Sequence, residues 1–340
     1  MCPSVALDRV GIDTYSPAWY VGEGSPAARA LDQLATNRAS RGSMLLPRPV
    51  AGHRVGWFPG THLVFAEGHL AGEGQLGPVS ALPGAVAAIA AAIRGVGVPL
   101  PEGRSLRPWR APERRPGFAG LRRVDAAADL RFEDPALGLA VLEVVAAVDP
   151  PRAAVSVWRR DGRVQTVAVR GYGSGRVLGR VYDKGAESKS APRGQLIRLE
   201  DQRRYQSGTR PTADAGGLAT VHELFRERFS YASHARMVVG RVPDLARHLA
   251  PRVADGTIPL AKLERVLGFL ALQGMGGDRS HLPRATYYRR RAEARELGVV
   301  AAQAPGATLR ELDLAAIFDL ALGAGAWERI EQDAAAAAAG

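Results

Sequence analysis

Short stretches in which apolar and polar residues alternate, separated by glycine- and proline-rich turns, recur through the first two hundred residues of this chain. They occur at 10–20, 53–58, 62–67, 121–132, 153–159, 164–170, 176–183 and 195–203. A period of two is typical of strands whose two faces meet different surroundings. A helical stretch at 137–148 interrupts the series. Because helix and strand are interleaved, we predict an α+β domain built on an antiparallel or mixed sheet.

The pattern turns helical after residue 218. Leucines at 260, 263, 267 and 270 follow the spacing of a helix that is apolar on one side, and 207–217 is a turn-rich linker. The length of 340 residues exceeds that of one average domain. We therefore predict a sheet domain over 1–206 and a helical domain over 218–335.

The chain is strongly basic, with 45 Lys and Arg against 34 Asp and Glu and a formal net charge of +11. Lysine occurs only at 184, 189 and 262, so nearly all of this charge is arginine. The planar guanidinium binds phosphate oxygens in pairs, which makes nucleic acid the leading partner. A high-GC genome explains the preference for arginine over lysine, but it does not explain the surplus of bases over acids.

The compartment is predicted from cysteine and from apolar runs. Cys2 is the single cysteine, which excludes an internal disulfide and suits a reducing cytoplasm. The longest apolar run, 81–93, is too short to span a bilayer and ends at Arg94. We predict a core helix there, no membrane partner, and a cytoplasmic protein of a bacterial cell.

Three strand-like segments carry charged or phenolic side chains on one face. By alternation, the groups that share a face are Arg123 with Asp125, Arg198 with Glu200, and Arg180 with Tyr182 and Lys184. If these strands are neighbours, one surface displays carboxylates, a phenol and cations. The alternative is a set of ion pairs on a solvated sheet face.

Such a surface suits the cleavage of phosphodiesters. Carboxylates hold Mg²⁺ or Mn²⁺, cations neutralise the charge that develops in the transition state, and a tyrosine hydroxyl attacks phosphorus. A tyrosine with an ordinary pKa of about 10 needs help at neutral pH. Lys184 or the metal ion is the expected source of that help.

The segment around the phenol resembles a known family. Residues 180–187 (RVYDKGAE), preceded by 171–175 (GYGSG) and followed by 196–200 (LIRLE), are similar to the core of the plasmid and phage replication initiation factor family of the Rep_trans type. Residues 121–129 (LRRVDAAAD) resemble an earlier motif of that family, and Ile12-Asp13 resembles its opening strand. The resemblance covers roughly residues 5–230 as a series of short motifs.

The resemblance implies an HUH-endonuclease-like sheet with flanking helices and a tyrosine that becomes linked to a 5′ phosphate. It puts the nucleophile at Tyr182, and the side chains expected to assist it are Lys184, Arg180 and Arg198. The metal-binding carboxylates that it implies are Asp125 and Glu200, with Asp129 or Glu187 as further ligands. The chain has no His-x-His pair, so the histidine ligands of other HUH nucleases are missing. Tyr172 and Tyr205 remain rival nucleophiles.

The glycine cluster at 171–179 lacks the spacing of a dinucleotide-binding loop. Arg170 and Arg176 flank it, so its backbone amides and these two cations are candidates for contact with a DNA phosphate. The other interpretation is a hairpin turn without a function of its own.

A second concentration of basic residues lies at 282–298. Pro283 suits the first turn of a helix and Gly298 suits its C-terminal cap. With a preceding helix at 260–272, this indicates a helix-turn-helix or winged-helix-like DNA reader. Its predicted DNA contacts are Arg284, Arg289, Arg290 and Arg291. The alternative is a solvated basic helix that packs on the catalytic domain.

These observations predict a rolling-circle replication initiator that nicks and rejoins one DNA strand through a phosphotyrosine. The expected partners are double-stranded origin DNA and its nicked strand, and we also consider a host helicase and a second copy of the chain. The alternative function is a non-catalytic regulator that binds an origin or operator. A regulator has no need of Tyr182 or its acidic neighbours, and these residues favour the enzyme.

Overall fold

The structure is a computed structural model of the whole chain. It describes residues 5–35, 37–38, 43–71, 75–77, 81–103, 116–148, 150, 153–171, 177–205, 210–213, 215–233, 235–274, 282–302, 307–323 and 325–327. The chain divides into two compact units. The first comprises 1–8, 128–200 and 227–323, and the second comprises 9–127, 201–226 and 324–340. The predicted domain boundary at 206–218 lies within the second unit, and the division into domains at that point stays a prediction.

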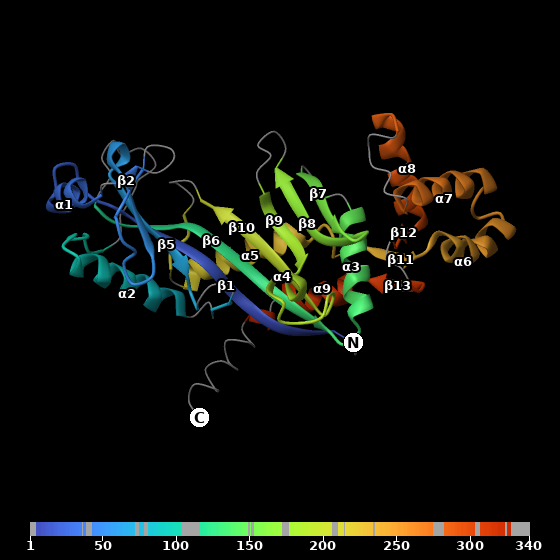
Figure 1. Cartoon of the computed structure of the whole chain (residues 1–340), viewed down its shortest axis with the longest axis horizontal. Helices are drawn as coiled ribbons and strands as arrows, with labels where there is room; N and C mark the ends of the chain where they lie inside the picture. The colour runs from blue at the N-terminus through green and yellow to red at the C-terminus, as the bar shows by residue number, and fades with distance from the viewer. Residues whose placement is uncertain are drawn as a thin grey trace, which may run out of the picture. The chain divides into compact units, whose positions relative to one another are not determined.

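Hydrogen-bonded strands follow the order β2-β3-β4-β5-β1-β6-β10-β9-β8-β7, and a separate small sheet has the order β12-β11-β13. Three long strands contribute residues to both units: β1 (Val5–Tyr20), β6 (Gly117–Phe132) and β10 (Leu196–Arg204). The prediction of an α+β fold with a large antiparallel sheet is confirmed (Figure 1).

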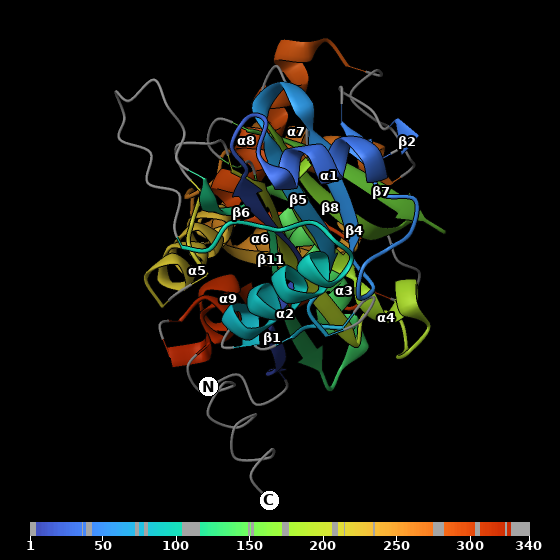
Figure 2. The ribbon, with the colours of Figure 1, turned by 90° about the vertical axis from the view of Figure 1, so that its left-hand side faces the viewer.

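The described part of the second unit is mostly an antiparallel meander with helices beside it. Figure 2 looks onto it, with its helices in the foreground. Its elements are α1 (Pro26–Leu34), β2 (Asn37–Arg38), β3 (Met44–Leu45), β4 (Arg54–Phe58), the 3₁₀ turn η2 (Pro59–Thr61), β5 (Leu63–His69) and α2 (Leu82–Gly95). Helix α1 begins at Ser25, whose hydroxyl accepts from the Ala28 amide at 3.1 Å. Helix α2 is the alanine-rich core helix that the apolar run predicts.

The first unit contains Tyr182 in a group of three paired strands. These are β7 (Ala153–Arg160), β8 (Arg163–Gly171) and β9 (Val177–Asp183), which pair antiparallel in sequence order and are followed by the short helix α4 (Lys184–Ser188). Helix α3 (Pro135–Ala147) packs against β7, β8 and β9. Val155 and Val157 line a cavity together with α3, so the odd-numbered side chains of β7 point toward that helix. Even-numbered side chains of β7 point to the other face.

Two glycines bring the start of α3 close to the turn before β10. A Cβ at Gly138 would lie 2.0 Å from the Gly194 carbonyl oxygen, and a Cβ at Gly194 would lie 2.2 Å from the Pro135 carbonyl oxygen. Gly194 also has a φ of +83°, a conformation that L side chains rarely adopt. The contact between helix and turn therefore requires glycine at both positions.

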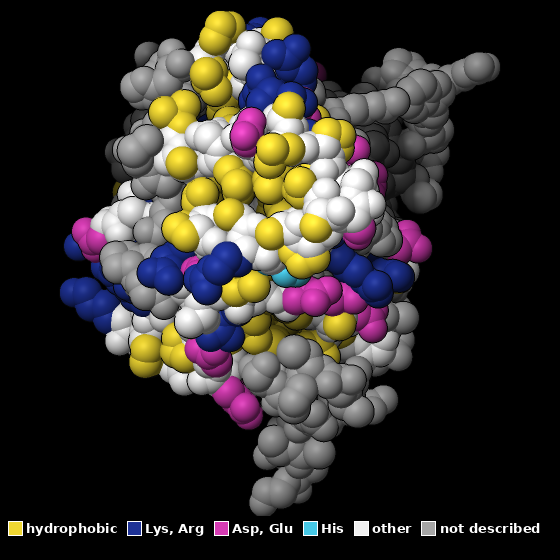
Figure 3. Space-filling model, turned by 90° about the vertical axis from the view of Figure 1, so that its right-hand side faces the viewer, with side chains coloured by type: hydrophobic (Ala, Val, Ile, Leu, Met, Phe, Trp, Pro, Cys, Tyr) yellow, Lys and Arg dark blue, Asp and Glu magenta, His cyan; other side chains and the backbone are white. Residues whose placement is uncertain are grey.

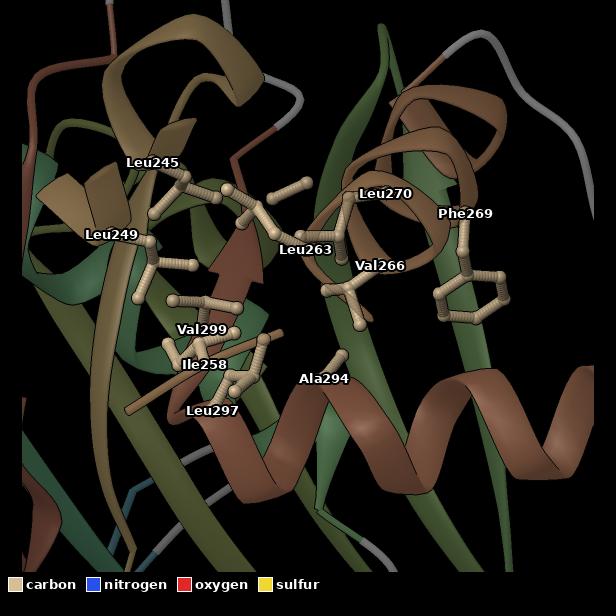
Figure 4. Packing of buried hydrophobic residues seen from close by; sticks show 11 residues of the cluster. Leu245, Leu249, Ile258, Leu263, Val266, Phe269, Leu270, Ala294, Leu297 and Val299 are labelled. Carbon is tan, nitrogen blue, oxygen red and sulfur yellow. The ribbon is translucent and has the colours of Figure 1, made fainter. Parts of the chain in front are cut away.

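The rest of the first unit is a helical module around the small sheet. The last residues of α5 (Ala215–Phe229), most of which belongs to the second unit, lead into it. Its other elements are β11 (Arg236–Gly240), α6 (Val242–Ala254), α7 (Leu260–Gly274), α8 (Arg284–Leu297), β12 (Val299–Ala301), β13 (Arg310–Asp313) and α9 (Leu314–Leu322). Figure 4 shows the core that α6, α7, α8 and β12 share. Its buried side chains include Leu245, Leu249, Leu263, Val266, Phe269, Leu270 and Leu297.

The three packed helices α6, α7 and α8 agree with the helical character predicted for this region. Strand β12 runs parallel to β11, and β13 runs antiparallel to β11 on its other side. In a winged helix, by contrast, the strands that flank the wing form a hairpin. Because β11 lies between β12 and β13, this small sheet does not have that arrangement.

Figure 3 looks onto the α6 and α7 end of the first unit and shows a band of apolar side chains with Lys and Arg groups on both sides. Leu260 at the start of α7 is 58% exposed. Among the described helices, none is both long and apolar enough to cross a membrane.

Candidate active site

Tyr182 lies near the end of β9 and its hydroxyl donates a hydrogen bond to Glu200 on β10. The distance from the hydroxyl oxygen to Oε2 of Glu200 is 3.0 Å. The other carboxylate oxygen, Oε1, accepts from Nη2 of Arg180 at 2.7 Å. Glu200 is 1% exposed and Tyr182 is 5% exposed, whereas the Arg180 side chain is 33% exposed. The carboxylate is thus buried between a phenol and a guanidinium.

Two cations lie over the ring of Tyr182. The guanidinium carbon of Arg180 is 5.2 Å from the ring centroid, and Nζ of Lys184 is 5.9 Å from it. These distances are within the range of cation–π contacts. The predicted sharing of one face by Arg180, Tyr182 and Lys184 therefore agrees with these contacts.

Neighbouring cations and a metal ion would lower the pKa of Tyr182, but its pKa is shifted in the opposite direction. Burial raises the pKa of its hydroxyl above the ordinary value, and the charge of Glu200 raises it further. Arg198 and Arg180 lower this pKa, but they do not outweigh burial. The ammonium of Lys184 is 2.8 Å from Oε2 of Glu187 in an ion pair, and the help expected from Lys184 stays a prediction. Tyr182 thus holds its proton at neutral pH.

Asp183 fixes the chain directly after the phenol. Its carboxylate accepts from the Ala186 amide at 3.0 Å and from the Gly194 amide at 2.8 Å, so it caps α4 and ties it to the turn before β10. The side chain is buried, and burial raises the pKa of the Asp183 carboxyl. Asp183 was not predicted as a site residue, although Asp is among the residues most favoured at the N-cap of a helix.

Arg198 and Asp129 form a buried ion pair. Nε of Arg198 donates to Oδ1 of Asp129 at 2.6 Å, and Nη2 donates to Oδ2 at 2.8 Å. Arg198 is 2% exposed and Asp129 is 3% exposed. Arg198 lies two residues before Glu200 on β10, and its charge lowers the pKa of Tyr182, so the pair belongs to the surroundings of the phenol.

A second cluster of the same residue types lies in the other unit. Arg123 donates through Nε to Oδ1 of Asp125 at 2.9 Å and through Nη2 to Oδ2, and its Nη1 donates to Oε1 of Glu67 at 2.6 Å. Asp125 is 1% exposed. Glu67 was not among the predicted site residues. Tyr205, the rival nucleophile, is half-buried, and burial raises the pKa of its hydroxyl.

The predicted metal ligands do not form a metal centre as they are placed. Within the described ranges, no group of three or more His, Cys, Asp or Glu side chains could hold an ion. Glu200 contacts Arg180, Asp129 contacts Arg198, and Asp125 contacts Arg123. Glu187 is paired with Lys184. An ion would have to displace a cation at any of these carboxylates.

The arginines of α8 differ in their surroundings. Arg291 donates to the carbonyl oxygens of Ala146 and Ala147 at 3.1 and 3.3 Å, which satisfies the C-terminal end of α3. Arg290 is 2.8 Å from Oε2 of Glu293. Arg284 and Arg289 are exposed, and the guanidinium of Arg284 lies 5.9 Å from the centroid of the Tyr288 ring.

Three predicted residues near the glycine cluster have separate outcomes. Arg170 lies one residue before the end of β8, and its guanidinium carbon is 5.3 Å from the centroid of the Trp158 ring. Tyr172 and Arg176 lie outside the described residues.

A buried ion pair between α3 and β7 was also missed. Glu143, 6% exposed, accepts from Nη1 and Nη2 of Arg159 at 2.9 and 3.0 Å. Burial raises the pKa of this carboxyl, and the arginine opposes the shift. The signal in the sequence is a single acid inside the apolar stretch 137–148. The pair borders a cavity of about 400 Å³ between α3, β7, α7 and α8.

No protein-family model matches the chain, and no curated protein matches its sequence. Among solved structures, the chain is weakly similar to a rolling circle replication initiator protein from Geobacillus stearothermophilus. That similarity has a TM-score of 0.29 and 11% identity, and it covers 67% of this chain and 85% of the other. A heterotetrameric sarcosine oxidase from Corynebacterium sp. U-96 matches over the same shares with a TM-score of 0.19 and 13% identity. Similarities of this size carry no functional argument, so the function proposed below rests on the site.

Proposed function

We propose that this protein is a rolling-circle replication initiator that nicks and rejoins one DNA strand through Tyr182. The observation that carries the proposal is the hydrogen bond from the Tyr182 hydroxyl to Glu200, with Arg180 on the other oxygen of the same carboxylate. A nucleophile, a proton acceptor and a cation are the groups that phosphoryl transfer to a hydroxyl requires.

In the proposed reaction, the oxygen of Tyr182 attacks phosphorus while its proton passes to Glu200. The bond from phosphorus to the 3′ oxygen breaks, and that oxygen takes up a proton from water and leaves as a 3′ hydroxyl, while Glu200 returns the tyrosine proton to solvent. The 5′ phosphate stays on the tyrosine as a phosphodiester, so the reverse attack by a 3′ hydroxyl rejoins the strand. The energy of the original bond is conserved in the intermediate.

The raised pKa of Tyr182 determines when its proton is lost in this step. Because the phenol is protonated at neutral pH, proton transfer to Glu200 has to accompany attack. Arg180 also has a buried Nε that lacks a hydrogen-bond partner in the described part of the chain. Since buried donors are normally paired, this N–H is suited to a phosphate oxygen of the substrate.

Two further elements complete the proposal. The exposed Arg284 and Arg289 of α8 contact the phosphates of duplex origin DNA. The use of Mg²⁺ or Mn²⁺ is a proposal that derives from the sequence. Glu200 and Asp129 are the carboxylates that would bind the metal ion, each in place of the arginine it now contacts.

The test is incubation of the protein with supercoiled DNA that carries its cognate replicon, with Mn²⁺, followed by a search for protein attached to a 5′ end. We expect relaxed circles with covalently bound wild-type protein and none with Tyr182→Phe. Site-specific binding without any adduct would overturn the proposal and favour the non-catalytic regulator.

A further inference from the structure

Trp158 is exposed on the edge strand of the large sheet. It is 46% exposed, whereas Trp19, Trp57 and Trp327 are at most 5% exposed. Strand β7 is the last strand in the hydrogen-bonded order, and Trp158 lies near its C-terminal end. A large aromatic side chain left in solvent forgoes the stabilisation that burial would provide, and its accessible face is available for stacking on a ligand.

The ring lies on the same face of the sheet as the phenol. Trp158 is paired in register with Thr166 on β8, and Thr166 is paired with Tyr182 on β9. Paired residues on adjacent strands put their side chains on one face, and strands lie about 4.8 Å apart, so the two aromatic residues are separated by about 10 Å along this row. The residue between them is a threonine. In the neighbouring row of paired residues, Ser156 on β7 is paired with Ala168 on β8, and Ala168 is paired with Arg180 on β9.

The charge around the ring is positive. The guanidinium of Arg170 lies over the Trp158 ring at 5.3 Å. At the end of the same hairpin, Arg160 and Arg163 are directly opposite one another. Like charges at facing positions of a sheet are destabilising, and an anionic partner offsets this repulsion. The surface thus combines an accessible ring with cations and small side chains.

We propose that Trp158 is a stacking platform for an unpaired base of the strand that Tyr182 attacks, with Arg170 beside the phosphate of that nucleotide. This inference rests on the proposed function for its substrate. An exposed ring with adjacent guanidinium groups binds single strands because every base presents a face to stack on, whereas bases in a duplex are stacked on one another. The occupant is therefore single-stranded DNA and not the duplex.

The experiment measures binding of a short fluorescein-labelled oligo(dT) to the full chain carrying Tyr182→Phe, so that no chemistry intervenes. Stacking of one base predicts that Trp158→Ala lowers the affinity roughly 5- to 150-fold. Trp158→Phe, which keeps a ring, should restore most of the affinity. The matched control is Val157→Ala, a change on the same strand at a residue that is 38% exposed and points to the opposite face. It should bind as the parent protein does.

A second readout uses the intrinsic fluorescence of Trp158. Unlabelled oligo(dT) should quench tryptophan emission in the parent protein, and the quenching should largely vanish in Trp158→Phe. If Trp158→Ala binds as tightly as Val157→Ala and quenching persists in Trp158→Phe, the platform is wrong, whatever the protein does to supercoiled DNA. If the platform is found but no substrate is nicked, the stacking site stands and the proposed enzyme fails.

Discussion

Two clusters in this molecule are built from the same short pattern, an arginine and a carboxylate separated by one residue on a strand. In the Arg123 cluster, both oxygens of Asp125 accept from that arginine, which also reaches Glu67. In the Tyr182 cluster, Arg198 turns to Asp129, and Glu200 instead accepts from Arg180 and from the phenol. The two clusters thus differ in what binds the second carboxylate oxygen, which is the same arginine in Asp125 and a phenol in Glu200.

This difference separates a structural ion pair from a site suited to chemistry. When a guanidinium occupies both oxygens, the carboxylate can no longer accept a proton readily. When a hydroxyl occupies one oxygen, its proton already has an acceptor at hydrogen-bonding distance. The pattern in the sequence is thus less informative than the partner that each carboxylate finds.

The largest expected effect comes from removing the phenolic oxygen. Tyr182→Phe should lower nicking by on the order of 10³-fold or more, because no other group in the cluster can form the covalent bond. Tyr205→Phe is the matched change beside the Arg123 cluster and should leave nicking within about 3-fold. The measurement is the yield of protein–DNA adduct. An adduct that survives Tyr182→Phe and disappears in Tyr205→Phe would reverse the assignment of the two clusters.

Glu200→Gln should have the next largest effect. An amide oxygen still accepts the hydrogen bond from Tyr182 but does not take its proton, so the single-turnover rate should fall by roughly 10²- to 10⁴-fold. Circular dichroism and duplex binding serve as controls for the fold. A rate within a few-fold of wild type would remove Glu200 as the proton acceptor.

Removal of divalent ions tests the same cluster from another side. We expect chelation with EDTA to abolish nicking and Mn²⁺ to restore it. In Glu200→Gln the residual rate should no longer respond to Mn²⁺, whereas Asp125→Asn should keep the response. Full activity in EDTA would defeat the metal proposal and leave Arg180 as the group that neutralises charge.

Asp125→Asn should affect stability more than chemistry. The change weakens a buried hydrogen-bonded ion pair, and we expect a loss of about 1–3 kcal/mol in the free energy of unfolding. Urea unfolding measures this loss, and the nicking rate per folded molecule should stay within about 3-fold. Lost nicking at unchanged stability would instead make Asp125 a ligand or catalytic group, as the family resemblance implies.

The smallest effect is on stability at alkaline pH. The folded-state pKa of Tyr182 is raised above the unfolded value of about 10, so its contribution to stability is complete below that pH and is lost as the pH rises past it. Tyr182→Phe should therefore show a smaller drop in urea midpoint between about pH 8 and about pH 10.5. Tyr205→Phe should show a similar effect, since burial also raises the pKa of the Tyr205 hydroxyl. Identical slopes in all three proteins would contradict the buried, protonated phenol.

The local features of the fold could be predicted because they depend on neighbours in sequence. Alternation located β7 to β10 within two residues at each end, and leucine spacing and capping residues located α7 and α8. Strands β12 and β13, with three and four residues, are too short to show a period, and the five-residue strand β11 was also not predicted. The Rep_trans-type resemblance stays a prediction.

Partners in the site were less predictable, since most lie far apart in sequence. The nearness of Arg123 to Asp125 can be inferred from spacing alone. By contrast, Arg198 finds Asp129, which is 69 residues away, and alternation gives no information about such a pair. The burial of Tyr182 could not be inferred from the sequence either. Burial raises the pKa of its hydroxyl, whereas a cation beside the ring would lower it.

The paired glycines at 138 and 194 limit how this protein can change. Neither residue takes part in the proposed reaction, but the Gly194 amide also binds Asp183, the residue directly after the nucleophile. Even the Cβ of alanine at either position would lie about 2 Å from a backbone oxygen, so a single substitution of either glycine would displace the backbone. Substitutions should therefore be tolerated more readily on the exposed edge strand β7 than at this junction beneath the phenol.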